Sequence, residues 1–133
     1  MSTLTYTVAL AFSCSALLGY AAEPAAPTLV PLFSKELADV PGKEALMLTV
    51  EYPPGAASEV HRHEAHGFIY VLEGSVVMQV AGGAAFTLTA GQTFYEGPND
   101  VHTVSRNASA TEPAKVLVLL LKKKGVPPVL PAN

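Results

Sequence analysis

Four histidines, the only ones in the chain, fall in two short segments. Three of them lie in HRHEAHGF, residues 61–68, and the fourth, His102, lies in GPNDVHTVSRN, residues 97–107. Neutral imidazole is the commonest side-chain ligand of metal ions in proteins. Surface histidines that do not belong to a common site are expected to be scattered along a chain, so this grouping favours a bound metal ion.

His61 and His63 have the spacing of a chelating pair. Side chains two residues apart in a β-strand point to the same face, so the two imidazoles can lie side by side. A metal ion held there needs a third ligand from elsewhere in the chain. His102 is the available one, because it follows a turn-forming stretch, residues 97–100, that can direct it inward.

The segments that must position these histidines are short and strand-like. Apolar and aromatic runs alternate with glycine and proline at a spacing of roughly ten residues, which is typical of an all-β sandwich or closed barrel. The expected strands cover residues 45–52, 58–63, 68–74, 75–83, 84–91, 93–96, 102–107 and 114–122. The aromatic residues of these segments are predicted to fill the barrel core: Phe68, Tyr70, Phe86, Phe94 and Tyr95.

Composition limits the range of functions. A chain of 133 residues is long enough for one domain with a buried core. The formal net charge is -3, and the one basic cluster is residues 122–124, so there is no electrostatic footprint for nucleic acid. A small-molecule ligand or substrate is the expected partner.

The first 21 residues differ from the rest. They contain no charged side chain, and residues 8–18 are largely apolar, which resembles a secretory signal peptide cleaved after Ala21. The apolar run is short for a bilayer-spanning helix, so we expect no stable membrane span in the mature form and an exported, periplasmic or secreted protein. Cys14 would be removed with the leader, leaving no thiol for a disulfide or a metal. The expected organisation is a signal peptide (1–21), an N-terminal arm with one edge strand (22–44), a barrel (45–122) and a C-terminal tail (123–133).

Two longer runs resemble the motifs of the cupin family. Residues 55–63, GAASEVHRH, followed by Gly74, resemble the first motif, G-x5-H-x-H-x(3,4)-E-x6-G. Residues 91–107 resemble the second motif, G-x5-P-x-G-x2-H-x3-N, and His102 falls at its histidine. The resemblance covers about residues 45–122. It implies a double-stranded β-helix, a small jelly-roll barrel, with a metal ion in its mouth and commonly a homodimer.

The first motif departs from the family pattern at one position. Its glutamate falls at Gly67, which has no side chain to offer a metal ion. His66 is the proposed replacement and completes the predicted ligand set of His61, His63, His102 and His66, although strand alternation directs it outward unless a bulge rotates it. Other candidates for the fourth ligand remain open at this point: Glu64, Gln79, Glu96 or water.

The resemblance also implies a function. Three neutral imidazoles leave a divalent ion at +2, which attracts anionic ligands and keeps coordination positions open. Imidazole suits several metals, so the ion is predicted as divalent Fe, Mn, Zn, Ni or Cu without a choice among them. The first hypothesis is a metal-dependent, dioxygenase-like enzyme acting on a small molecule, with Tyr70, Glu96 or His66 as its acid or base. The alternative is a non-catalytic cupin that binds a small ligand or metal outside the cytoplasm.

Overall fold

The computed structural model describes residues 22–132, which form ten β-strands and no helix. The predicted signal peptide, residues 1–21, lies outside the described residues, as does Asn133. Within the described part of the chain there is thus no helix long and apolar enough to cross a membrane.

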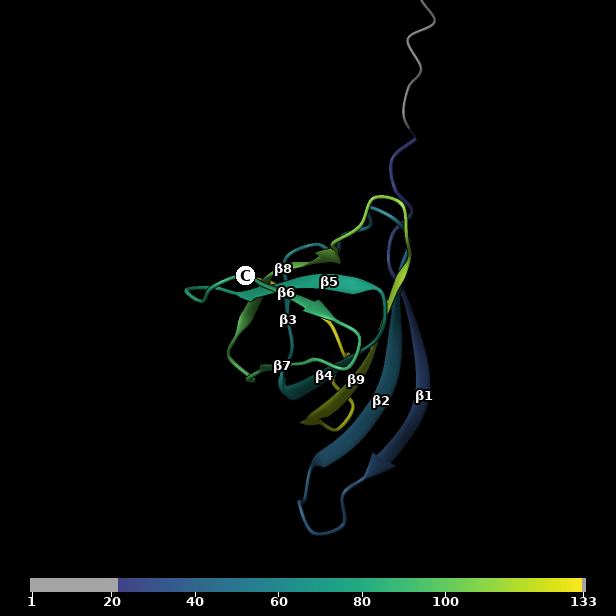
Figure 1. Ribbon diagram of the computed structural model, residues 1–133. Helices are drawn as coiled ribbons and strands as arrows, with labels where there is room; N and C mark the ends of the chain where they lie inside the picture. The colour runs from purple at the N-terminus through teal and green to yellow at the C-terminus, as the bar shows by residue number, and fades with distance from the viewer. Residues whose placement is uncertain (1–21, 133) are drawn as a thin grey trace, which may run out of the picture.

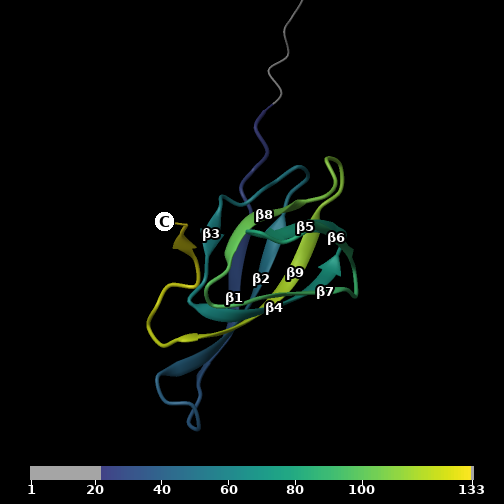
Figure 2. The ribbon, with the colours of Figure 1, turned by 90° about the vertical axis from the view of Figure 1, so that its left-hand side faces the viewer.

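The strands form two five-stranded antiparallel sheets. The first sheet contains, in spatial order, β1 (Thr28–Glu36), β2 (Lys43–Tyr52), β9 (Ala114–Lys123), β4 (Ala65–Glu73) and β7 (Thr93–Glu96). The second contains β10 (Leu130–Pro131), β3 (His61–Arg62), β8 (Val101–Asn107), β5 (Ser75–Val80) and β6 (Phe86–Thr89). From β2 to β10 the chain passes repeatedly from one sheet to the other, and β5, β6 and β8 lie above β4, β7 and β9 (Figures 1 and 2). The all-β jelly-roll prediction is therefore confirmed.

Side-chain alternation decides which residues face the interior. In β4 the buried positions are the odd-numbered ones, including Gly67 and Ile69, and the even-numbered positions are exposed. In β9 the buried positions are the even-numbered ones, including Val118 and Leu120. This period of two is what a strand with one face on the core requires.

The prediction that the aromatic residues fill the core is wrong for four of the five. Phe68 and Tyr70 stand on the outward positions of β4, and Phe86 and Tyr95 are also about half exposed. Only Phe94 packs, partly buried, against the core. The core is aliphatic instead and includes Leu48, Val50, Ile69, Val71, Met78, Val116 and Leu120.

The two ends of the described chain sit at the sheet edges. β1 pairs with β2 along the edge of the first sheet, and the hairpin between them projects beyond the barrel (Figure 1). After β9 the tail returns to the second sheet, where β10 pairs with β3 as an edge strand. The tail thereby places Leu130 opposite Arg62 and Pro131 opposite His61.

Candidate metal centre

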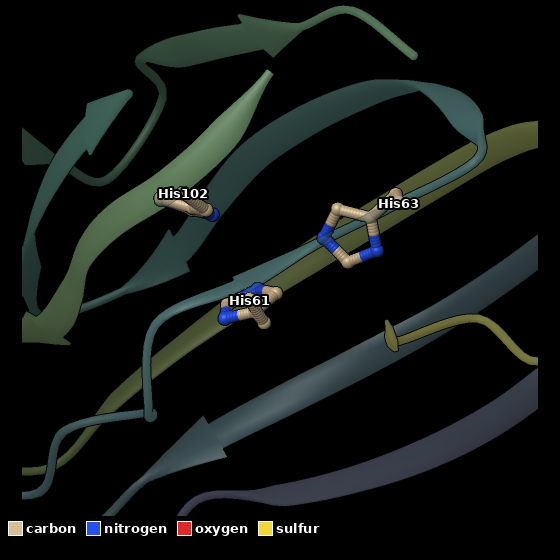
Figure 3. Close-up of side chains that lie close together, drawn as sticks. All are labelled: His61, His63 and His102. Atoms are coloured by element: carbon tan, nitrogen blue, oxygen red, sulfur yellow. The ribbon is translucent and has the colours of Figure 1, made fainter. Parts of the chain in front are cut away.

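The fold brings three histidines together at one end of the barrel. His61 on β3 lies directly opposite His102 on β8, and their ring centroids are 5.0 Å apart. The ring of His63 lies 4.9 Å from that of His61. One nitrogen from each ring lies within 4.8 Å of the others, so the three can share a metal ion. Figure 3 shows the side chains converging from β8 and from the segment that contains β3.

Backbone carbonyl groups orient two of these rings. The Nδ1 of His61 lies 2.7 Å from the carbonyl oxygen of Glu59, and the Nδ1 of His63 contacts the carbonyl oxygen of Pro128. A carbonyl only accepts, so in each ring Nδ1 carries the proton and donates it. In neutral His61 this leaves the lone pair on Nε2, which is the arrangement found in metal-ligating histidines. The Nε2 of His63 instead faces a carboxylate oxygen of Glu96.

A buried carboxylate, Glu96, lies against the same histidines. It is at the end of β7 and only 2% exposed. Its Oε1 is 3.0 Å from the Nε2 of His63, and its Oε2 is 3.0 Å from the Nδ1 of His102. The contact between Oε2 and the Nδ1 of His102 lacks the geometry of a hydrogen bond. Oε2 and both ring nitrogens of His102 are therefore buried without a hydrogen-bond partner among residues 22–132. Such unsatisfied buried groups are costly, and a cation held between the carboxylate and the rings would satisfy them.

The pKa values follow from burial and from Glu96. Burial lowers the pKa of His61, with smaller contributions from His102 and His63, which keeps this imidazole neutral. Burial alone would also lower the pKa of His63, but the hydrogen bond and charge of Glu96 outweigh it and raise the pKa. Burial alone would raise the pKa of Glu96, yet the contacts with His102 and His63 bring it down to about 2. Glu96 is therefore an anion at neutral pH.

The site opens on a cavity of about 580 Å³ inside the barrel. Most of its wall is aliphatic, including Leu48, Val50, Ile69, Met78, Val116 and Leu120. Its polar side chains are fewer: besides the histidines and Glu96, they are Ser58, Glu59, Tyr52 and Ser105. The hydroxyl of Tyr52 lies 2.6 Å from that of Ser105. Burial raises the pKa of Tyr52, so its hydroxyl stays protonated and can donate. A mostly apolar cavity with a few convergent polar groups is typical of a small-molecule site.

His66 lies apart from the three converging histidines. It occupies an exposed position on β4, and its Nδ1 is 2.8 Å from the hydroxyl of Tyr95 on the outer face of the sheet. The bulge that could rotate it inward is absent, because the pairing of β4 with β9 runs without a shift from Ala65 to Val71. Tyr70 also points outward, so neither it nor His66 reaches the cavity as an acid or base.

Of the remaining candidates for a fourth ligand, only Glu96 lines the cavity. Glu64 pairs with Arg62 across 3.6 Å, and Gln79 donates to the carbonyl oxygen of Gly83. Sequence reasoning missed the contribution of Pro128, because a backbone carbonyl from a distant tail leaves no local signal. It also missed the Tyr52–Ser105 pair, although both lie at inward positions of their strands.

Comparison with known proteins identifies the family. The sequence matches the cupin domain over residues 48–120, more than half of the chain, so the protein belongs to the cupin family. No curated protein matches the sequence. The histidine cluster and its nitrogen donors fit the transition-metal ions that cupins commonly bind.

Solved structures share the fold. The protein TT1209 from Thermus thermophilus is 30% identical with a TM-score of 0.60, and the match covers 75% of this chain and 87% of that one. An oxalate oxidase in complex with the substrate analogue glycolate is 20% identical with a TM-score of 0.61, covering 78% and 54% of the two chains. The DMSP lyase DddQ from Ruegeria pomeroyi is 23% identical with a TM-score of 0.58, covering 65% and 42%. At these identities the last two show the fold alone.

Proposed function

We propose that the protein binds one divalent transition-metal ion through His61, His63 and His102 and acts as an enzyme on a small molecule held in the adjoining cavity. The observation that carries this proposal is the convergence of three imidazoles on the wall of an apolar cavity, with the Nδ1 atoms of His61 and His63 each held by a backbone carbonyl group. The names of two structurally similar cupins, an oxalate oxidase and a DMSP lyase, describe enzymes of small molecules and support this choice.

Different residues of the cavity would have different roles in binding a ligand. The aliphatic wall would hold the carbon skeleton of the ligand and exclude water, which strengthens polar interactions inside. The hydroxyl groups of Tyr52 and Ser105 offer one polar contact away from the histidines. A bound transition metal would polarise a coordinated oxygen of the substrate or activate dioxygen. Because activation of dioxygen is one of these roles, we propose oxygenase chemistry as the first reaction class to test.

One observation favours a second function, capture of a small ligand or of the metal without turnover. Glu96 is the buried carboxylate of the cavity, and it is already engaged with His63 and His102. The hydroxyl of Tyr52 is protonated and paired with Ser105. General acid–base catalysis needs a group free to exchange a proton with the substrate, whereas a binding protein needs only shape and charge.

The two functions are separated by measuring turnover and binding on the same preparations. Protein stripped of metal and reloaded with Fe²⁺, Mn²⁺, Zn²⁺, Ni²⁺ or Cu²⁺ is screened with small carboxylates, thiols and phenols for oxygen consumption and for thermal stabilisation. An enzyme should consume oxygen or substrate only when loaded, and His102→Ala should abolish this. Thermal stabilisation without turnover under every metal would favour the binding protein. Absence of metal binding would contradict both the metal-dependent enzyme and the capture of metal, and would leave a metal-free ligand-binding protein.

We also propose a homodimer, supported by the outer face of the first sheet. Register pairs align one apolar row across all five strands of that sheet: Phe33, Met47, Leu119, Phe68 and Tyr95. Phe33, Phe68 and Tyr95 are each about half exposed. A continuous apolar row on an open sheet face is a surface that a second copy can cover.

Export is proposed from the sequence of residues 1–21. An exported protein should lose this leader, so the mass of the protein recovered from its native cells should correspond to a chain that begins at Ala22. Recovery of the full-length chain from the cytoplasmic fraction would contradict export.

A further inference from the structure

Gly67 and Glu96 form a complementary pair on neighbouring strands. Gly67 on β4 lies directly opposite Glu96 on β7. A Cβ atom added at Gly67 would lie 2.8 Å from the Cγ of Glu96 and 2.9 Å from its Oε1, which is too close for real atoms. The absence of a side chain at Gly67 is therefore what lets the Glu96 carboxylate enter this space.

The carboxylate that enters is aimed at the histidines. Its two oxygens approach different rings, one at the Nε2 of His63 and the other at the Nδ1 of His102. Oε2 makes no hydrogen bond within residues 22–132, and neither does any ring nitrogen of His102. Burying an anion beside an imidazole with two unpaired nitrogens destabilises the protein unless a cation binds between the two groups.

We propose that Glu96 is the fourth protein ligand of the metal ion, supplied from β7 through the opening at Gly67. This inference rests on the proposed metal site and deepens it. The ligand set becomes three imidazoles and one carboxylate, which leaves a divalent ion at +1 rather than at the +2 expected from histidines alone. The carboxylate missing at position 67 of β4 is thus restored from the facing position of the adjacent strand.

The placement requires both residues at once. Alanine at position 67 would displace the Glu96 side chain while leaving its charge in the protein, because the nearest atoms lie within 3.0 Å of the new Cβ. Glutamate at position 67, combined with glycine at position 96, would return a carboxylate to the same space from the opposite strand. Position 67 is an inward-facing site of β4, so the exchanged side chain would point toward the histidines.

The test compares Glu96→Gln with wild type by titration of metal-free protein with Co²⁺, followed by visible absorption and by competition with a chelator. Co²⁺ reports directly on its ligands through the position and intensity of its absorption bands. We expect Glu96→Gln to weaken Co²⁺ binding by at least about 10-fold, the scale that even indirect partners of a metal site reach, and to change the spectrum. Glu64→Gln is the matched control, since this nearby carboxylate pairs with Arg62 and should leave both readouts unchanged.

The reciprocal exchange keeps the test decisive if Glu96→Gln does not fold. The double variant Gly67→Glu/Glu96→Gly should bind Co²⁺ more tightly than Glu96→Gln or Glu96→Gly, and Gly67→Ala should bind it more weakly than wild type. An unchanged Co²⁺ spectrum in Glu96→Gln, even with reduced affinity, would overturn the assignment of Glu96 as a ligand. So would a folded exchange variant that binds no better than Glu96→Gly. If wild type itself binds no metal, the metal site of the proposed function fails as well, and the two failures are thus distinguishable.

Discussion

His61 and His102 occupy directly opposed positions on the antiparallel strands β3 and β8, with ring centroids 5.0 Å apart. The cross-strand register therefore fixes the separation of two ligands that lie far apart in the sequence. Opposed side chains in such a pair lie within direct contact distance, so no flexible loop is needed to bring them together. This rigidity is what a preformed metal site requires.

Removing His102 should abolish metal binding, and removing His66 should not. His102→Ala takes one of three converging donors from the site, whereas His66→Ala removes an exposed side chain that contacts Tyr95 on the outer face. Elemental analysis of the two variants, purified in parallel, checks this. Loss of metal from His66→Ala with retention in His102→Ala would contradict the arrangement of the site.

Removing residues 127–133 should weaken metal binding by about 10–100-fold, the usual cost of losing a group that orients a ligand. The deletion takes away the Pro128 carbonyl that contacts the Nδ1 of His63, and it also takes away β10, which pairs with β3. Calorimetric titration with metal measures the affinity, and circular dichroism checks that the fold persists. Equal affinities of the folded truncated and full-length proteins would show that the tail does not position His63.

The stability of the metal-free protein should depend on pH through the contact between Glu96 and His63. The pKa of Glu96 falls from its usual 4.5 to about 2 on folding, so its stabilising contribution is full above pH 4.5 and is lost as pH falls toward 2. The pKa of His63 is raised, so its contribution is full below 6.5 and is lost as pH rises through the raised value. Wild type should therefore exceed Glu96→Gln in Tm most between pH 4.5 and 6.5. A Tm difference that stays constant from pH 3 to 9 would rule out this coupling.

Charge on the outer face of the first sheet should break the proposed dimer. Phe68→Asp places a carboxylate in the middle of the apolar row, where burial against a second copy would be costly. Light scattering after gel filtration should give the mass of a monomer for this variant and of a dimer for wild type. Phe86→Asp is the matched control: Phe86 is similarly exposed but lies on β6 of the other sheet, so this variant should stay dimeric.

Much of the fold could be predicted from local patterns, because strand alternation and turns depend on residues that are neighbours in the sequence. The expected strand at 93–96 has the same bounds in the structure, and that at 114–122 differs by one residue. The burial of the aromatics could not be predicted in this way, because alternation does not say which of the two faces meets the core. Phe68 and Tyr70 share the outward face of β4, and the smaller Gly67 and Ile69 face inward.

The site was predictable where its residues are close in sequence and less so where register brings them together. The spacing of His61 and His63 pointed to a shared face, and the second motif pointed to His102. The relation between Gly67 and Glu96 depends on which strand pairs with β4 and at which offset, and no local pattern encodes that. Glu96 was accordingly one of several open candidates from the sequence, and the structure places it beside the histidines.

Elemental analysis of the protein purified without an affinity tag decides whether His61, His63 and His102 hold a metal ion. We expect close to one transition-metal ion per chain in wild type, and none above background in His61→Ala. Wild-type protein that remains free of metal after reconstitution with each divalent ion, while still folded, would contradict this expectation.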